Sequence, residues 1–109
     1  MTIERMDKII DGQLKYCQDL LVSKGKEYAD DKSDRLQAFK TAAKLQGVTP
    51  EQALAGMMCK HTLSVYDLIE SGSRNLTIWE EKITDHINYL LLLKCLIMDE
   101  IGASEEVSA

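Results

Sequence analysis

The sequence is poor in the features that mark several common classes of protein. Its 109 residues include a single proline, and no segment alternates apolar and polar residues as a β-strand would. The longest apolar run, Tyr89–Leu93, is far shorter than the roughly 20 residues that a membrane-spanning helix needs. The sequence therefore predicts an all-α fold, a four-helix bundle, with no membrane partner.

Positive charge is also scarce. Acidic residues outnumber basic ones by 18 to 13, which gives a net charge of −5. Binding to a nucleic-acid polymer needs clustered Lys and Arg, so we expect no such partner. A small anion needs only a local positive patch and stays compatible with this composition.

Cysteines are few, and their pattern is uninformative for metal or disulfide chemistry. The three cysteines, Cys17, Cys59 and Cys95, are an odd number without a C-x-x-C pair, so neither a disulfide framework nor a zinc site is expected. We expect three small buried side chains in a reducing cytosol. The charged segment MTIERMDK at the start has no signal-peptide core, which favours a cytoplasmic location.

Apolar residues at helical spacing define the first half of the chain. A first helix is predicted over residues 2–23, with Gly25 as its C-cap. The polar segment 24–34, KGKEYADDKSD, is predicted to be a loop. A second helix is predicted from residue 34 or 35 to Gln46, before Gly47. Its expected buried face consists of Leu36, Phe39 and Ala43, with Leu45 as a further candidate.

Two capping-box patterns predict where the helices in the second half of the chain begin. Thr49 precedes Pro50 and Gln52, which predicts a third helix that continues to about Ser71. Its expected inward residues are Leu54, Met57, Met58, His61, Val65, Leu68 and Ile69. Thr77 and Glu80 form the second box, which opens a fourth helix that runs to about Ile101.

The fourth helix is unusually apolar. Within residues 89–98 only Lys94 is charged, so apolar side chains surround the axis and must be buried on several sides. A second subunit could cover the surface that the short partner helices leave, or the helix could lie at the centre of a compact monomer. We favour a homo-oligomer. Residues 1–102 are expected to form a single helical domain, and 103–109 a flexible acidic tail.

Polar residues at the start of the fourth helix are the first candidates for chemistry. Glu81, Asp85 and Asn88 follow one another at i, i+4 and i+7, which places them on one face. Clustered carboxylates repel one another unless a cation neutralises them, and magnesium prefers such oxygen ligands. Glu81 and Asp85 are therefore candidate magnesium ligands. The alternative is a solvated first turn, where acids also suit the helix dipole.

Basic and aromatic residues elsewhere could meet a nucleotide. Lysines or arginines bind phosphates, and a tyrosine can stack on a base. The candidates are Lys24, Lys26, Tyr28, Arg35 and Lys60, together with His61 and Asn88. The alternatives are a solvated loop of mixed charge for the first four residues and a satisfied core residue for His61.

The combined pattern resembles a known family. Residues 24–28 (KGKEY), 34–39 (DRLQAF), 60–61 (KH) and 79–91 (WEEKITDHINYLL) are similar to small phage proteins with the nucleotide-modification-associated, MazG-like helical domain of the all-α nucleoside triphosphate pyrophosphatases. The resemblance covers roughly residues 12–98, and D-x-x-N-Y-L-x-L-L is its most specific part. It implies magnesium held by acids on two helices and a basic loop on the phosphates. Asp85 corresponds to the last residue of the family's E-x-x-D motif, whose first position holds Lys82 here.

These observations lead to a prediction of nucleotide binding. One hypothesis is a magnesium-dependent nucleoside triphosphate pyrophosphohydrolase, for which no catalytic residue is assigned. A second is a non-catalytic phage protein, in the host cytoplasm, that sequesters a nucleotide signal or inhibits a host factor. A third is a purely structural helical partner. The incomplete acidic set favours the second over the first.

Overall fold

The computed structural model describes residues 1–28 and 34–102, with the side chains of 24–28 left out. This part of the chain holds four helices and no strand: α1 (Ile3–Tyr28), α2 (Gln37–Gln46), α3 (Pro50–Ser71) and α4 (Leu76–Glu100). The predicted all-α class is confirmed. The chain divides into two compact units, one formed by Met1–Ser33 and the other by Asp34–Ala109. The predicted tail 103–109 lies outside the described residues.

The first unit contains the single helix α1. Thr2 begins it, because the Thr2 hydroxyl accepts the Arg5 N–H at 3.1 Å. The helix continues through Gly25 to Tyr28, so the prediction that it ends before a loop at residue 24 is wrong. A glycine ends a helix only where it turns left-handed. The Lys and Glu residues around Gly25 are good helix formers that outweigh its cost of about 1 kcal/mol.

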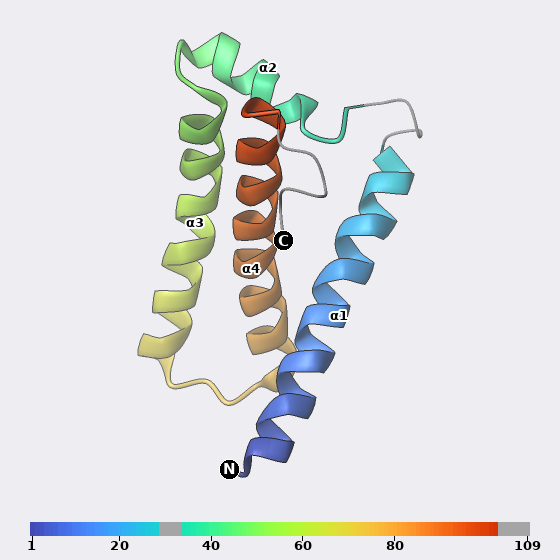
Figure 1. Cartoon of the computed structure of the whole chain (residues 1–109). Coiled ribbons are helices and arrows are strands. Elements are labelled where there is room, and N and C mark those ends of the chain that lie inside the picture. The colour runs from blue at the N-terminus through green and yellow to red at the C-terminus, as the bar shows by residue number, and fades with distance from the viewer. Residues whose placement is uncertain (29–33, 103–109) are drawn as a thin grey trace. The chain divides into compact units, whose positions relative to one another are not determined.

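The second unit is built on two long helices. Figure 1 shows α3 and α4 side by side and antiparallel, with α2 lying across one end of the pair. The core consists of Leu36, Phe39, Leu54 and Leu96, with Met57, Met58, Tyr89, Leu92 and Leu93 packed against it.

The predicted buried faces are right in part. Leu36, Phe39, Ala43 and Leu54 are buried as predicted. Leu45 and Ile69 are exposed, contrary to prediction, because a small unit of three helices covers only a narrow stripe of each helix. Cys17 is buried, whereas Cys59 and Cys95 are exposed, which corrects the expectation of three buried thiols.

The helix ends follow local side-chain chemistry. Thr49 and Gln52 form the predicted capping box, with their hydroxyl and amide each bonded to the other's backbone N–H. Gly47, at φ 68°, ends α2 in a left-handed turn in which the Val48 N–H reaches Ala43 O at 3.0 Å. The predicted start of α4 at Thr77 is wrong, because Asn75 caps the helix by accepting the Ile78 N–H.

Candidate functional site

A group of polar side chains lies where α3 faces α4. His61 of α3 places Nδ1 4.0 Å from Asp85 Oδ2 of α4. The His61 ring also contacts the Tyr89 ring, with centroids 4.7 Å apart and planes tilted by 34°. Both members of the His61–Asp85 pair are half-buried. The separation suits an ion pair when the imidazole is protonated. We call His61, Asp85 and Tyr89, together with Asn88 three residues after Asp85 on α4, the α3–α4 polar cluster.

A second polar contact joins the same two helices. The Thr62 hydroxyl lies 3.0 Å from His86 Nε2 and 3.4 Å from the Met58 carbonyl oxygen. Thr62 follows His61, and His86 follows Asp85, so this contact lies about 100° around each helix from the cluster. It fixes the relative rotation of α3 and α4, because each helix must present the same flank for the two side chains to meet.

Asn88 differs from the other members of the cluster in its burial and in its hydrogen bonding. It lies one turn beyond Asp85 on α4 and is only 6% exposed. Its Oδ1 is buried and has no hydrogen-bond partner among the described residues. A buried acceptor without a partner costs about 1–3 kcal/mol, so folding places a polar atom where an apolar one would be more stable. The sequence predicts this residue as a candidate because it shares one face of the helix with Glu81 and Asp85.

The predicted magnesium ligands are not joined by further donors. Glu81 is exposed, and the side-chain contact recorded for Asp85 is with an imidazole rather than another carboxylate. In the ranges described, no three His, Cys, Asp or Glu side chains converge on a point that could hold a metal ion. Magnesium prefers several oxygen ligands, so these donors do not fit a resident magnesium ion. The assignment of Glu81 and Asp85 stays a prediction.

The other predicted binding residues are scattered or lie outside the description. The side chains of Lys24, Lys26 and Tyr28 are among those not described. Lys60 is exposed on α3, directly before His61. Arg35 lines a groove of about 420 Å³ near Asp99, whereas Asp85 lies 14 residues earlier on α4, about 21 Å along the helix. The structure therefore does not bring Arg35 to the polar cluster.

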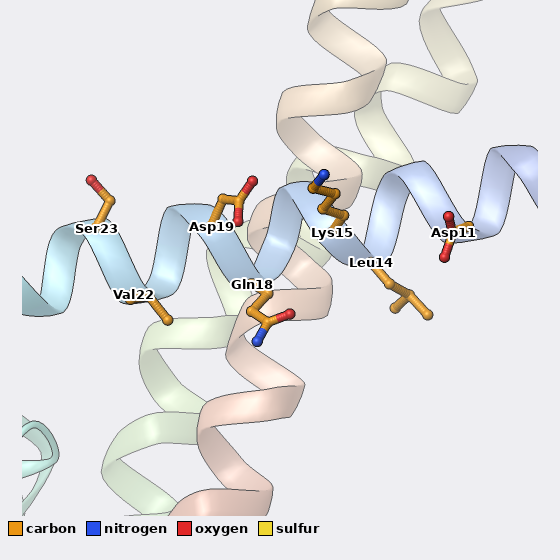
Figure 2. Close-up of a pocket in the computed structure, with 7 residues that line it drawn as sticks. All are labelled: Asp11, Leu14, Lys15, Gln18, Asp19, Val22 and Ser23. Atoms are coloured by element: carbon orange, nitrogen blue, oxygen red, sulfur yellow. The ribbon is translucent and has the colours of Figure 1, made fainter.

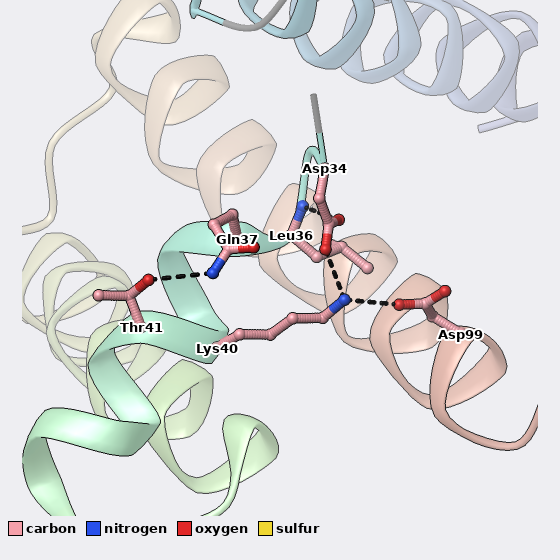
Figure 3. A network of polar contacts seen from close by, with 6 residues as sticks. All are labelled: Asp34, Leu36, Gln37, Lys40, Thr41 and Asp99. Carbon is pink, nitrogen blue, oxygen red and sulfur yellow. Dashed lines mark hydrogen bonds and ion pairs between the residues drawn. The ribbon is translucent and has the colours of Figure 1, made fainter. Parts of the chain in front are cut away.

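An ionic network that the sequence did not suggest lies at the C-terminal end of α4. Lys40 of α2 binds Asp34, and it also binds Asp99 of α4 at 2.9 Å (Figure 3). The other oxygen of Asp34 accepts the Leu36 N–H at 2.9 Å. Lys40 and this N–H lower the pKa of Asp34, and Asp34 and Asp99 raise that of Lys40. The three charged groups connect residues far apart in sequence, so no local motif could have revealed them.

Two carboxyl groups lie close together beside this network. Glu51, in the first turn of α3, forms a hydrogen bond with Glu100, the last residue of α4. The contact lowers the pKa of Glu51 and raises that of Glu100, because one group keeps the proton that the other accepts. Both side chains lie at the protein surface, so this pair is a feature of the helix ends rather than a binding site.

One groove among the described residues runs along α1. It has a volume of about 760 Å³, and Figure 2 shows its lining side chains along a single helix. They are Asp11, Leu14, Lys15, Gln18, Asp19, Val22 and Ser23. The mixture of two acids, one lysine and apolar stems gives no convergent set of polar groups. Size alone therefore does not make this groove a candidate site.

Comparison with known proteins adds no assignment. The sequence matches no protein-family model, and the comparisons with curated proteins and solved structures gave no match. The similarity to MazG-like phage proteins therefore stays a prediction from the motifs. Among the described helices, none combines the length and the apolar character needed to cross a membrane.

Proposed function

We propose that this protein binds a nucleotide, or an anion derived from one, at the α3–α4 polar cluster. The observation that carries the proposal is the buried Asn88 Oδ1, for which the described part of the chain supplies no partner. A ligand that donates an N–H or O–H to this oxygen would recover the 1–3 kcal/mol, roughly, that the free protein loses there. The amino, imino and hydroxyl groups of a nucleoside are donors of this kind.

The neighbours of Asn88 suit the other parts of such a ligand. Tyr89 and His61 are half-buried rings in contact, and aromatic faces of this kind stack on bases. Lys60, exposed beside His61, has the length and charge to reach a phosphate. Asp85 can accept a hydrogen bond from a ribose hydroxyl. These roles rest on residue chemistry and on the placement of the four side chains along facing helices.

Binding without hydrolysis is the form of this function that we favour. Hydrolysis of a triphosphate by this type of protein needs a metal-activated water, and the described donors are too few for a resident magnesium ion. A small binder of this kind would act by sequestering a nucleotide signal or by inhibiting a host factor, which is the role we propose if the protein is phage-encoded.

Mass spectrometry after incubation with a mixed nucleotide pool tests the proposal. We expect an unchanged nucleotide to be recovered from the denatured protein, both with and without magnesium. New monophosphate that appears only with magnesium would instead establish the pyrophosphohydrolase. If no species is retained or converted, nucleotide binding is wrong and a structural helical partner remains.

A matched pair of variants assigns the binding to the cluster. Asn88→Leu removes the acceptor at similar volume and should abolish retention of the nucleotide. Asn75→Ala removes a helix cap at the distant start of α4 and should leave retention unchanged. Equal loss in both variants would show that stability, and not the Asn88 oxygen, controls binding.

Self-association is a second part of the proposal. Packing against α3 leaves apolar residues of α4 at the surface, among them Leu90, Leu91 and Ile97. Exposed apolar surface that is continuous along a helix favours a protein partner. Leu96 lies in the core of the second unit and Leu92 packs against that core, so substitutions at these two residues would test folding and not association.

A further inference from the structure

The side-chain amide of Asn88 can form two hydrogen bonds of opposite direction. Its Oδ1 accepts, and the residues that the structure describes supply no donor to it. Nδ2 of the same amide donates. The residue is only 6% exposed, so bulk water is a poor substitute partner. A flat ligand edge that carries a donor next to an acceptor would bond to both atoms of the amide at once.

A donor next to an acceptor is the pattern of a nucleobase edge and not of a phosphate group. Each of the four common bases has an N–H or amino group beside a ring nitrogen or a carbonyl oxygen. A phosphate at neutral pH presents oxygens that mainly accept, and these would face the Asn88 oxygen without a hydrogen between them. Asp85, three residues before Asn88 on the same helix, would also repel a phosphate. The amide therefore favours the base end of a nucleotide.

Positive charge lies near the cluster, but in contact with solvent. Lys60 is exposed directly before His61, and Lys82, three residues before Asp85, is half-buried. Either lysine can meet a phosphate that stays outside the cluster. Salt and solvent screen such contacts, so each adds little to the affinity. A hydrogen bond to a buried acceptor that lacks a partner adds more, because the ligand recovers what the free protein loses there.

We propose that the α3–α4 polar cluster recognises the base of its ligand, with Asn88 bonded to the donor–acceptor edge and the phosphates left in solvent. The rings of His61 and Tyr89, whose centroids lie 4.7 Å apart, supply an aromatic surface for the base. The ligand class is thus a nucleoside with any number of phosphates, including none. The inference rests on the nucleotide binding proposed above and names the part of the nucleotide that the site recognises.

Isothermal titration of the full chain with probes that separate base from phosphate tests the proposal. The probes are adenosine, cytidine, guanosine and uridine, each as nucleoside and as triphosphate, together with inorganic triphosphate. For the base that binds most tightly, we expect the nucleoside and the triphosphate to differ in affinity by less than about tenfold. Inorganic triphosphate should not bind. The analogue in which every N–H of that base is methylated should bind at least about tenfold more weakly, because no donor is left for the Asn88 oxygen.

Variants assign the recognition to Asn88. Asn88→Leu should abolish the binding of nucleoside and triphosphate alike, and thermal melts would verify that the variant folds. Lys60→Met should weaken the binding of the triphosphate but not that of the nucleoside. Lys44→Met, the same change at an exposed position of α2, is the matched control and should leave both affinities unchanged.

The outcomes separate base recognition from nucleotide binding. A triphosphate that binds while its nucleoside does not, or inorganic triphosphate that binds as tightly as a nucleotide, would overturn base recognition and leave nucleotide binding standing. The same holds for a base that binds equally well after methylation, or for an Asn88→Leu variant that binds as before. If no nucleoside and no nucleotide binds, the proposed function itself is wrong, and the inference fails with it.

Discussion

Two polar regions of α4 differ in whether their side chains have hydrogen-bonding or ionic partners in the described structure. At its C-terminal end, Asp99 is half-exposed and bound to Lys40, which also binds Asp34. Near its middle, Asn88 is almost fully buried, and its Oδ1 has no partner within residues 1–28 and 34–102 as described. In the first region each charged group is paired within the folded chain, and solvent screens these charges. In the second region the Asn88 oxygen lacks a hydrogen bond, and it is too deeply buried for bulk water to supply one.

This difference teaches where to look for function. An exposed ionic network holds helix ends together and changes the free energy of folding only slightly. Its presence therefore needs no ligand to explain it. A buried acceptor without a partner makes the free protein less stable, and such costs concentrate at functional sites. The Asn88 region is therefore the better candidate for binding, although the Lys40 network contains more charge.

The largest effect is expected from the apolar segment that separates the two regions. Leu96 is fully buried in the core, whereas the next residue, Ile97, is 43% exposed. Leu96→Ala should lower the free energy of unfolding by about 2–5 kcal/mol, because it removes contacts and leaves a cavity. In urea denaturation at protein concentrations low enough for the protein to be monomeric, Ile97→Ala should cost much less. Equal losses would mean that Ile97 is covered within the monomer itself.

A change of opposite sign is expected at Asn88. Asn88→Leu should raise the stability of the ligand-free protein by about 1–3 kcal/mol, because it replaces an unsatisfied buried oxygen with an apolar group of similar size. Thermal melts without nucleotide would measure the change. A lower melting temperature would contradict the contrast between the two regions, since it would show that Asn88 has a structural partner.

An intermediate effect is expected at the start of α3. The Thr49 hydroxyl accepts the Gln52 N–H at 3.2 Å, and Thr49→Ala should cost about 1 kcal/mol in urea denaturation. Thr49→Ser, which keeps the hydroxyl, is the matched control and should change stability little. If alanine and serine behave alike, the cap contributes nothing that water does not replace.

Local signals predicted much of the fold, and long-range contacts account for what they missed. The boundary between α2 and α3 was predicted correctly from Gly47, Thr49 and Pro50. Such a prediction succeeds because the hydrogen bonds of a helix cap involve only a few neighbouring residues. Gly25 did not end α1, since a glycine without a left-handed turn is only a weak interruption. Leu45 has the right spacing for a buried residue but lacks a neighbouring element to cover it.

The candidate site was predictable only as single residues. Asp85, Asn88 and His61 drew attention through polarity next to apolar runs, which is a local signal. That His61 meets Asp85, and that Asn88 Oδ1 is left without a partner, depends on the rotation of α3 against α4. The Lys40–Asp99 contact spans 59 residues and depends in the same way on how α2 crosses α4.

The smallest effects are expected at the exposed carboxylates, where they should have opposite signs. The pKa of Asp34 is lowered from its ordinary 3.8 by Lys40 and the Leu36 N–H. The contribution of the Asp34 carboxylate to the stability of the fold is therefore present above pH 3.8 and is lost as the pH falls through the lowered pKa. Asp34→Asn should accordingly destabilise the protein at pH 7, and this destabilisation should shrink as the pH falls through the lowered pKa of Asp34. The pKa of Glu100 is raised from its ordinary 4.5 by Glu51, so its contribution is present below pH 4.5 and is lost as the pH rises through the raised pKa. Glu100→Gln keeps the donor that the protonated acid supplies, and it should stabilise the protein at pH 7 but not below pH 4.5.

Melting curves of both variants across this range, at low and high salt, would measure the two effects, and salt should reduce each. If both variants shift the melting temperature in the same direction at pH 7, the two contacts do not have the electrostatic roles assigned to them.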